Sequence, residues 1–181
     1  MLKYFVDFSI KLTASFSCIR NVIIIQIILL ILDLKGQQDL WKSLINKVSD
    51  EPVFNQPATQ EQLKEINDKF NLEITNELVN LLKESNGVET ECARFWSSNE
   101  IIEENIERRT LEVYKDSYMS FDSLLFFADA GNGDFFAFSI INGDIQKDDI
   151  YVWNHEDDSR TWIAPSLEDF LVWWSDGEIS I

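Results

Sequence analysis

The chain contains one histidine, and acid–base or nucleophilic chemistry would depend on it. His155 lies in the segment Trp153-Asn154-His155-Glu156-Asp157-Asp158. A catalytic triad needs a base beside a serine or a cysteine, so any such mechanism would rest on this imidazole. The segment follows a predicted strand and is rich in turn-forming residues. This position favours a solvated loop histidine over a general base or a metal ligand.

Carboxylates gather on both sides of the predicted strand 150–153. Asp144, Asp148 and Asp149 precede the strand, and Glu156, Asp157 and Asp158 follow it. Clustered oxygen ligands suit calcium, but the neighbouring loop 129–134 lacks the alternating acidic ligands and the terminal Glu of an EF-hand. Asp129 and Asp134 could form a catalytic pair, although aspartates that flank a turn are the simpler interpretation. We therefore predict no metal, no cofactor and no enzymatic activity, and a metal-dependent hydrolase is the less favoured alternative.

Aromatic residues are the next group that could bind a ligand. Phe126, Phe127, Phe135, Phe136 and Phe138 could stack nucleic-acid bases, but stacking platforms lie in positively charged grooves and this region is acidic. Core packing is the expected role of these rings. Trp173 and Trp174 are neighbours on a predicted helix, where adjacent side chains diverge by about 100°. We expect one of the two at the core edge or at an interface.

The composition is that of a folded and strongly acidic protein. The 181 residues are 45% hydrophobic, and 15 Lys and Arg against 32 Asp and Glu give a net charge of −17. Phosphate backbones and anionic lipids are repelled by such a chain, so we exclude nucleic acid as a partner and expect a basic protein. Cys18 and Cys92 show no disulfide or zinc spacing, which favours a reducing cytoplasm.

Residues 1–35 differ from the rest of the chain. They carry four basic and two acidic residues, a net of +2, which leaves −17 − 2 = −19 for residues 36–181. The apolar run 22–32 is shorter than the about 20 residues of a transmembrane helix, and extending it backwards would bury Arg20. We expect a leader outside the domain. A membrane anchor and a packed element are the alternatives, so membrane association stays open.

Periodic apolar residues predict helices in the first half of the domain 36–181. The first covers 37–48, and a loop over 50–58 follows it. Thr59 and Gln62 form the capping box of a second helix that ends near Asn71. A third helix begins at Thr75 and ends at Asn86-Gly87, and a shorter acidic helix begins at residues 97–100.

The second half has the pattern of strands. Two apolar runs, 123–128 and 135–141, surround a turn and predict a hairpin that is buried on both faces. Strands are also predicted at 150–153 and 160–164, with a turn at 142–144. Ser166 then begins a closing helix. Helices followed by antiparallel strands and a last helix indicate an α+β fold with a mostly antiparallel sheet.

The order of these motifs resembles the SUKH superfamily, also called the Smi/Knr-type domain, over about residues 37–175. The motifs are Trp41, the Thr59–Gln62 helix start, Leu78-x-x-Leu81-Leu82 before Asn86-Gly87, Phe126-Phe127-Ala128-Asp129, Gly133-Asp134-Phe135-Phe136-Ala137-Phe138, Ile150-Tyr151-Val152-Trp153 before Asn154-His155-Glu156, and Ser166-Leu167-x-x-Phe170-Leu171. The family commonly has Pro before the leucine-rich helix, where this chain has Ile74-Thr75.

The resemblance implies an α+β fold and, for bacterial members, an immunity protein that binds and neutralises a cognate toxin, often a nuclease or a deaminase. For fungal members it implies a regulatory protein of cell-wall synthesis. The net charge fits the first role, because an acidic surface can cover a basic substrate groove. We predict an acidic edge with aromatic anchors as the binding surface. Its residues are Asp129, Asp134, Asp144, Asp148, Asp149, Trp153, Glu156, Asp157, Asp158 and Trp174.

Overall fold

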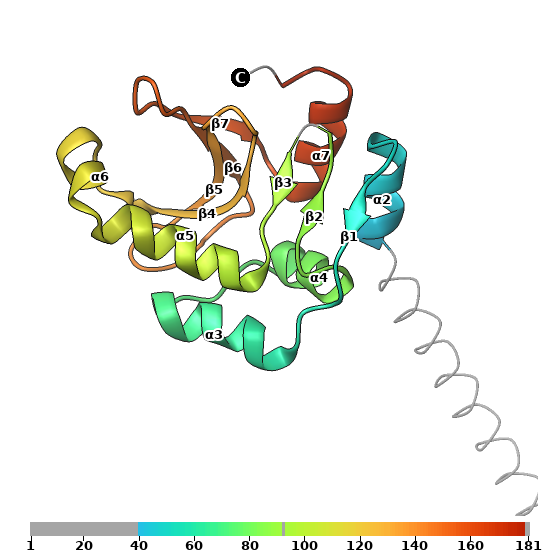
Figure 1. The fold of residues 1–181 in the computed structure, drawn as a ribbon, viewed down its shortest axis with the longest axis horizontal. Helices are drawn as coiled ribbons and strands as arrows, with labels where there is room; N and C mark the ends of the chain where they lie inside the picture. Colours follow the sequence, from blue (N-terminus) through green and yellow to red (C-terminus); the bar gives the residue numbers. More distant parts are fainter. Residues whose placement is uncertain (1–39, 92, 180–181) are drawn as a thin grey trace, which may run out of the picture. The chain divides into compact units, whose positions relative to one another are not determined.

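The computed structural model describes residues 40–91 and 93–179. These residues form a seven-stranded antiparallel sheet in which the spatial order of the strands follows their order along the chain (Figure 1). The strands are β1 (Val53–Phe54), β2 (Val88–Glu89), β3 (Arg94–Phe95), β4 (Leu124–Asp129), β5 (Phe135–Ser139), β6 (Ile150–Trp153) and β7 (Arg160–Ala164). The predicted leader, residues 1–35, and its boundary at Gly36 lie outside the described residues.

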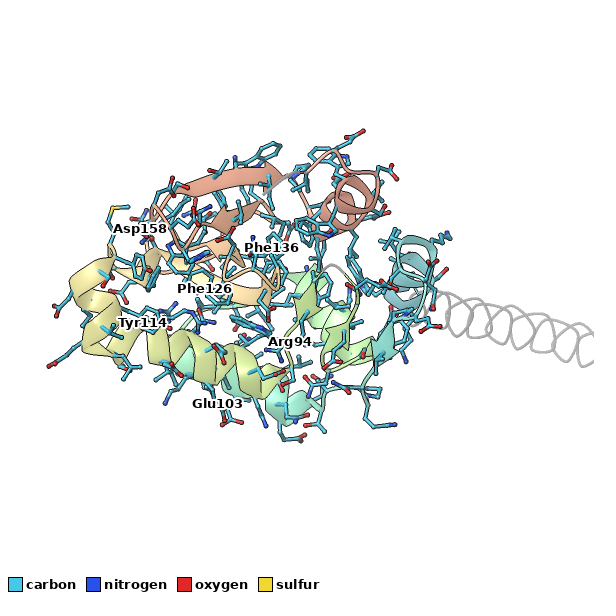
Figure 2. The ribbon with its side chains drawn as sticks, turned by 45° about the horizontal axis from the view of Figure 1, so that its top comes forward. Arg94, Glu103, Tyr114, Phe126, Phe136 and Asp158 are labelled. Atoms are coloured by element: carbon cyan, nitrogen blue, oxygen red, sulfur yellow. The ribbon has the colours of Figure 1, made fainter. Side chains whose placement is uncertain are left out.

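The centre of the sheet is the aromatic hairpin that the apolar runs predict. β4 and β5 pair from Leu124 opposite Ser139 to Asp129 opposite Phe135, with a bulge between Phe126 and Ala128. The inner residues of both strands are buried, which confirms burial on both faces. Figure 2 shows Phe126 and Phe136 within this interior. The aromatic residues therefore build the core rather than a stacking platform.

The described helices are α2 (Leu40–Val48), α3 (Gln60–Phe70), α4 (Asn76–Glu84), α5 (Ser98–Thr110), α6 (Glu112–Ser117) and α7 (Leu167–Ser175), with a short 3₁₀ turn, η1, at Phe121–Ser123. The capping boxes at Thr59 and Ser97 are present, because each hydroxyl accepts from the N3 amide and the N3 side chain accepts in return. Thr75 and Ser166 cap α4 and α7. The local signals for helix starts are thus confirmed.

Two predictions about the helices are wrong. α4 ends at Glu84 through an extended Ser85, before Asn86 and Gly87 are reached. The acidic helix α5 has 13 residues rather than being short. Its acidic residues obscure the apolar period, because Ile101, Asn105 and Arg108 share the buried face and only one of them is apolar.

The predicted loop 50–58 contains β1, and β2, β3, α6 and η1 were not predicted. β1, β2 and β3 have two residues each, too few for a period-2 pattern to be visible in the sequence. They form because β3 pairs with the edge of the longer strand β4, β2 pairs with β3, and β1 pairs with β2. The fold class is nevertheless as predicted, an α+β fold with an antiparallel sheet and a closing helix.

The helix α5 packs between another helix and the sheet. It contacts both α3 and β4, as Figure 1 shows. Asn105 is buried and donates through Nδ2 to the carbonyl of Phe126 at 2.7 Å, while its Oδ1 accepts from the Phe126 amide at 2.9 Å. α5 therefore satisfies backbone groups of β4 where β3 does not reach them. None of the helices in 40–91 and 93–179 has the length and apolar character needed to cross a bilayer.

Candidate partner-binding surface

The eight predicted carboxylates do not form one edge, because the strand register divides them. Phe135 pairs with Trp153 and Phe138 pairs with Ile150, so the loops 130–134 and 154–159 share one end of β5 and β6. The loop 140–149 connects these strands at their other end, about 10 Å away along the strands. Asp144, Asp148 and Asp149 are therefore separated from the other five carboxylates. The prediction of a single acidic edge is corrected to two acidic ends.

At the first end, His155 is a structural partner of a buried aspartate. Asp134 is only 2% exposed, and its Oδ1 accepts from the His155 amide at 3.0 Å and lies 2.7 Å from the His155 Nδ1. Asn132 donates to the other carboxylate oxygen at 3.2 Å. The histidine lies in a turn with its side chain 41% exposed, as predicted, and it is in addition held by hydrogen bonds to Asp134. Within the described residues, no group of three or more His, Cys, Asp or Glu could hold a metal ion.

Asp129 and Asp158, at the same end, are also occupied by internal hydrogen bonds. Asp129 Oδ2 accepts from Arg94 Nε at 3.1 Å and from Trp96 Nε1 at 2.8 Å. Asp158 accepts from Trp153 Nε1 and from the Met119 amide, both at 2.7 Å. These carboxylates connect the strand ends to other segments of the chain. They are less available to a partner than exposed side chains are, because their oxygens already have donors.

Glu156 and Asp157 are the exposed carboxylates of this end. Asp157 Oδ1 accepts from the Ser159 amide at 2.9 Å. Hydrogen bonds from Ser159, through its side chain and its amide, lower the pKa of Asp157. Asp157 therefore keeps its charge to a somewhat lower pH than an aspartate without these hydrogen bonds. These two residues form a small anionic rim.

At the second end lies a groove between the residues before α4 and the β5–β6 loop. It has a volume of about 360 Å³ and is lined by residues 73–76 and 144–148. A depression of about 640 Å³ shares Glu73 and Asp144 with it and adds Asp68. We call these two adjoining hollows the acidic groove. Asp144 and Asp148 are exposed, and neither carboxylate has a side-chain partner among the described residues.

Beside the acidic groove, carboxylates repel one another. Burial raises the pKa of Glu77, and repulsion from Asp148, Glu168 and Asp169 adds to that effect. The Leu167 amide donates to Glu77 Oε2 at 2.7 Å, which opposes the shift. Like charges gathered in this way destabilise the free protein, and a bound cation would relieve them. Glu73 and Glu77 were not among the predicted site residues, because only the fold brings α4 beside the β5–β6 loop.

The aromatic residue exposed near this end is Trp162, which was also not predicted. It is 46% exposed, and its Nε1 donates to Asp149 Oδ1 at 3.1 Å. Trp173 packs edge-on against it with ring centroids 6.2 Å apart. Asp149 also lies 3.7 Å from Lys147 Nζ. The exposed residues 161 and 162 of β7 follow no alternating pattern that would have identified this tryptophan.

The two tryptophans predicted as anchors are placed otherwise. Trp153 is 2% exposed and packs among Tyr118, Phe121 and Phe135, so it is not available as a surface anchor. Trp174 is half-buried, with its ring centroid 5.1 Å from that of Phe136. It belongs to the core edge. Trp162 is the tryptophan near this surface that is exposed enough to act as an anchor.

Comparisons with known proteins bear on this arrangement. No curated protein matches the chain. A family model, SUKH_6, described as SMI1-KNR4 cell-wall, matches residues 60–171. The matched region extends from the start of α3 into α7, and so includes the central sheet and the acidic groove. Because this match covers more than half of the chain and the α+β fold agrees with it, the chain belongs to the SUKH superfamily of SMI1-KNR4 domains.

Proposed function

We propose that the protein is a non-catalytic immunity protein of the cytoplasm, which neutralises a cognate bacterial toxin by covering a basic surface of that toxin. The substrate groove of a nuclease, or of a deaminase that acts on nucleic acid, has such a surface. The acidic groove, together with Asp149 and its hydrogen-bonded Trp162, is the proposed contact. Family membership and the net charge of −17 are consistent with this role.

The observation that carries the proposal is the concentration of unneutralised carboxylates around a concave surface. Asp144 and Asp148 line it without side-chain partners among the described residues, and Glu77 lies near Asp148 and two further carboxylates, Glu168 and Asp169. Such a surface steers a cationic protein during diffusional encounter. Trp162, which donates to Asp149, the neighbour in sequence of the groove residue Asp148, supplies an apolar contact, in the way that interface energy concentrates on aromatic residues surrounded by polar groups.

The test is coexpression of the full chain with the toxin domain encoded in the neighbouring gene, followed by measurement of complex formation. We expect rescue of growth and an association rate that falls as salt is raised, because exposed charges are screened. The double variant Asp144→Lys/Asp148→Lys should slow association about 10-fold or more and leave the dissociation rate less affected.

The matched control is Glu65→Lys/Glu103→Lys, which makes the same change in net charge at exposed residues of α3 and α5. Figure 2 shows Glu103 on the outer side of α5. If both double variants slow association equally, total charge rather than the acidic groove is responsible. If no neighbouring toxin is bound or neutralised at low salt, the proposed function is wrong.

A regulatory scaffold for an endogenous partner is the second candidate, and the family description, which names the cell wall, favours it. In that case a deletion of the gene would alter cell-wall composition in cells that encode no adjacent toxin. The immunity role instead predicts a phenotype only when the toxin is present.

A further inference from the structure

A second hollow lies among α5, α6 and η1, and its chemistry differs from that of the acidic groove. It has a volume of about 400 Å³ and shares no lining residue with the acidic groove. Its lining residues are Arg108, Arg109, Tyr114, Lys115, Tyr118, Met119, Ser120, Phe121 and Asp122. Three of these residues are cationic and one, Asp122, is a carboxylate, in a protein whose net charge is −17; one of the cations, Arg108, is paired with Glu104, which is not a lining residue. We call this hollow the arginine pocket.

The charge of Arg109 is not neutralised by an ion pair within the described residues. Its Nη2 donates to the backbone carbonyl of Leu124 at 2.6 Å, its guanidinium lies 4.6 Å from the Phe70 ring centroid, and its buried Nε has no acceptor there. Burial lowers the pKa of Arg109, against a smaller opposing effect of Asp122. A half-buried guanidinium without a carboxylate partner is an unfavourable arrangement that an incoming anion would relieve.

Arg108 adds a second guanidinium to the same wall. It is 6% exposed, and its Nη1 donates to Glu104 Oε2 at 2.5 Å, while its buried Nε has no partner in the described part of the chain. Its guanidinium carbon lies 4.0 Å from the Phe135 ring centroid and 5.7 Å from that of Tyr114. Packing between aromatic rings holds this group in one orientation. Arg108 is thus positioned but already paired, so among the described residues the lining cations without an ion pair are Arg109 and Lys115.

Aromatic rings also line the hollow, and exposed apolar residues lie at it and near it. Tyr114 and Tyr118 stack with centroids 6.2 Å apart, and Phe121 lies 6.0 Å from Tyr118. Met119 is 62% exposed, and Leu111, at the start of α6, is exposed as well. A bound molecule can therefore make apolar contacts outside the hollow as well as inside it. This extent fits a segment of a protein better than a small acid that the hollow would enclose.

We propose that the arginine pocket is a second partner-binding site, which takes an Asp or Glu side chain flanked by apolar residues on a segment of a protein. The carboxylate would pair with Arg109 and Lys115, and the flanking apolar side chains would contact Tyr118 and Met119. This site has the opposite charge preference to the acidic groove and does not depend on the proposed function.

The test uses the full chain and two labelled peptides, acetyl-Gly-Leu-Phe-Glu-Leu-Phe-Gly-amide and the same peptide with Gln in place of Glu. We expect the Glu peptide to bind at least about 10-fold more tightly than the Gln peptide in fluorescence anisotropy. Amide signals of Tyr114, Lys115 and Met119 should shift on titration with the Glu peptide. Arg109→Gln and the less buried Lys115→Gln should each reduce the preference for Glu.

The control variant is Lys69→Gln, which removes one exposed cation from α3. Equal losses in Lys69→Gln and Lys115→Gln would overturn the proposal, as would equal binding of the two peptides or the absence of saturable binding up to about 1 mM, the weak end of measurable affinity. 3-Phenylpropionate provides a further arm. Saturable binding of this small acid without binding of the Glu peptide would refute a protein segment as the occupant. A failure of toxin neutralisation would not affect any of these readouts.

Discussion

Replacement of Asn105 by Leu tests whether a side chain of α5 takes the place of a strand beside β4. The amide of Asn105 makes three hydrogen bonds, one to the Ile101 carbonyl at 2.7 Å and two to the backbone of Phe126. Leu has a similar size but removes all three, and it leaves the amide and carbonyl of Phe126 without this partner inside the protein. An unsatisfied buried group costs about 1–3 kcal/mol, so the variant should lose about 2–6 kcal/mol of unfolding free energy.

Urea unfolding of the full chain, followed by tryptophan fluorescence, measures this loss as a lower midpoint. The control is Asn99→Leu, at an exposed position of the same helix, which should change the unfolding free energy by about 0.5 kcal/mol or less. The expected loss is a large part of the about 5–15 kcal/mol that stabilises an ordinary domain. A loss in Asn105→Leu smaller than about 1 kcal/mol would show that water or β3 satisfies Phe126, and would refute the reasoning.

Three further predictions concern the two ends of the sheet. Glu77→Gln should raise the melting temperature at pH 7 but not at pH 4. The pKa of Glu77 in the folded protein is above its ordinary 4.5, so ionisation of Glu77 removes stability as the pH rises through that range. Circular dichroism across pH 4–7 measures the melting temperature. Gly133→Ala should lower the free energy of unfolding by about 1–3 kcal/mol, because the residue has a φ of +104° and the added Cβ would lie 3.1 Å from His155 Nδ1. An unchanged midpoint in urea unfolding would contradict this prediction. Trp153→Ala should cost about 3–5 kcal/mol of stability, because this side chain is buried. Trp162→Ala should cost about 1 kcal/mol of stability or less, but it should lower the affinity for the toxin. The reverse ranking of the two variants in urea unfolding would show that the burial of these tryptophans has been misassigned.

Local signals predicted the helix starts well because a cap is a contact between residues three positions apart. Thr59 with Gln62 and Ser97 with Glu100 need no tertiary partner, so their side chains identify them in the sequence. The aromatic strands β4 and β5 were also identifiable, since apolar residues continue through both. The short strands β1 to β3 could not be predicted, because two residues have no period and pair only where β4 presents an edge.

The candidate site was predicted only in part, and the reason lies in the register. Asp144 and Asp134 are both aspartates in predicted turns, yet one is exposed at the acidic groove and the other is buried against His155. Sequence proximity to β5 and β6 could not separate them, because loops at opposite ends of a short strand are only a few residues apart along the chain. Glu77 lies near Asp148, Glu168 and Asp169 only because the fold packs α4 beside residues that are distant in the sequence.

Composition and local pattern therefore determined the α+β class, the acidic character and the helix caps of this protein, since each of these depends on residue types or on neighbours within a few positions. The tertiary structure alone decided which charges meet and which tryptophan reaches the surface. In strands buried on both faces, Trp153 has no alternating pattern that distinguishes it from an exposed position, and its burial follows from Tyr118 and Phe121 covering it.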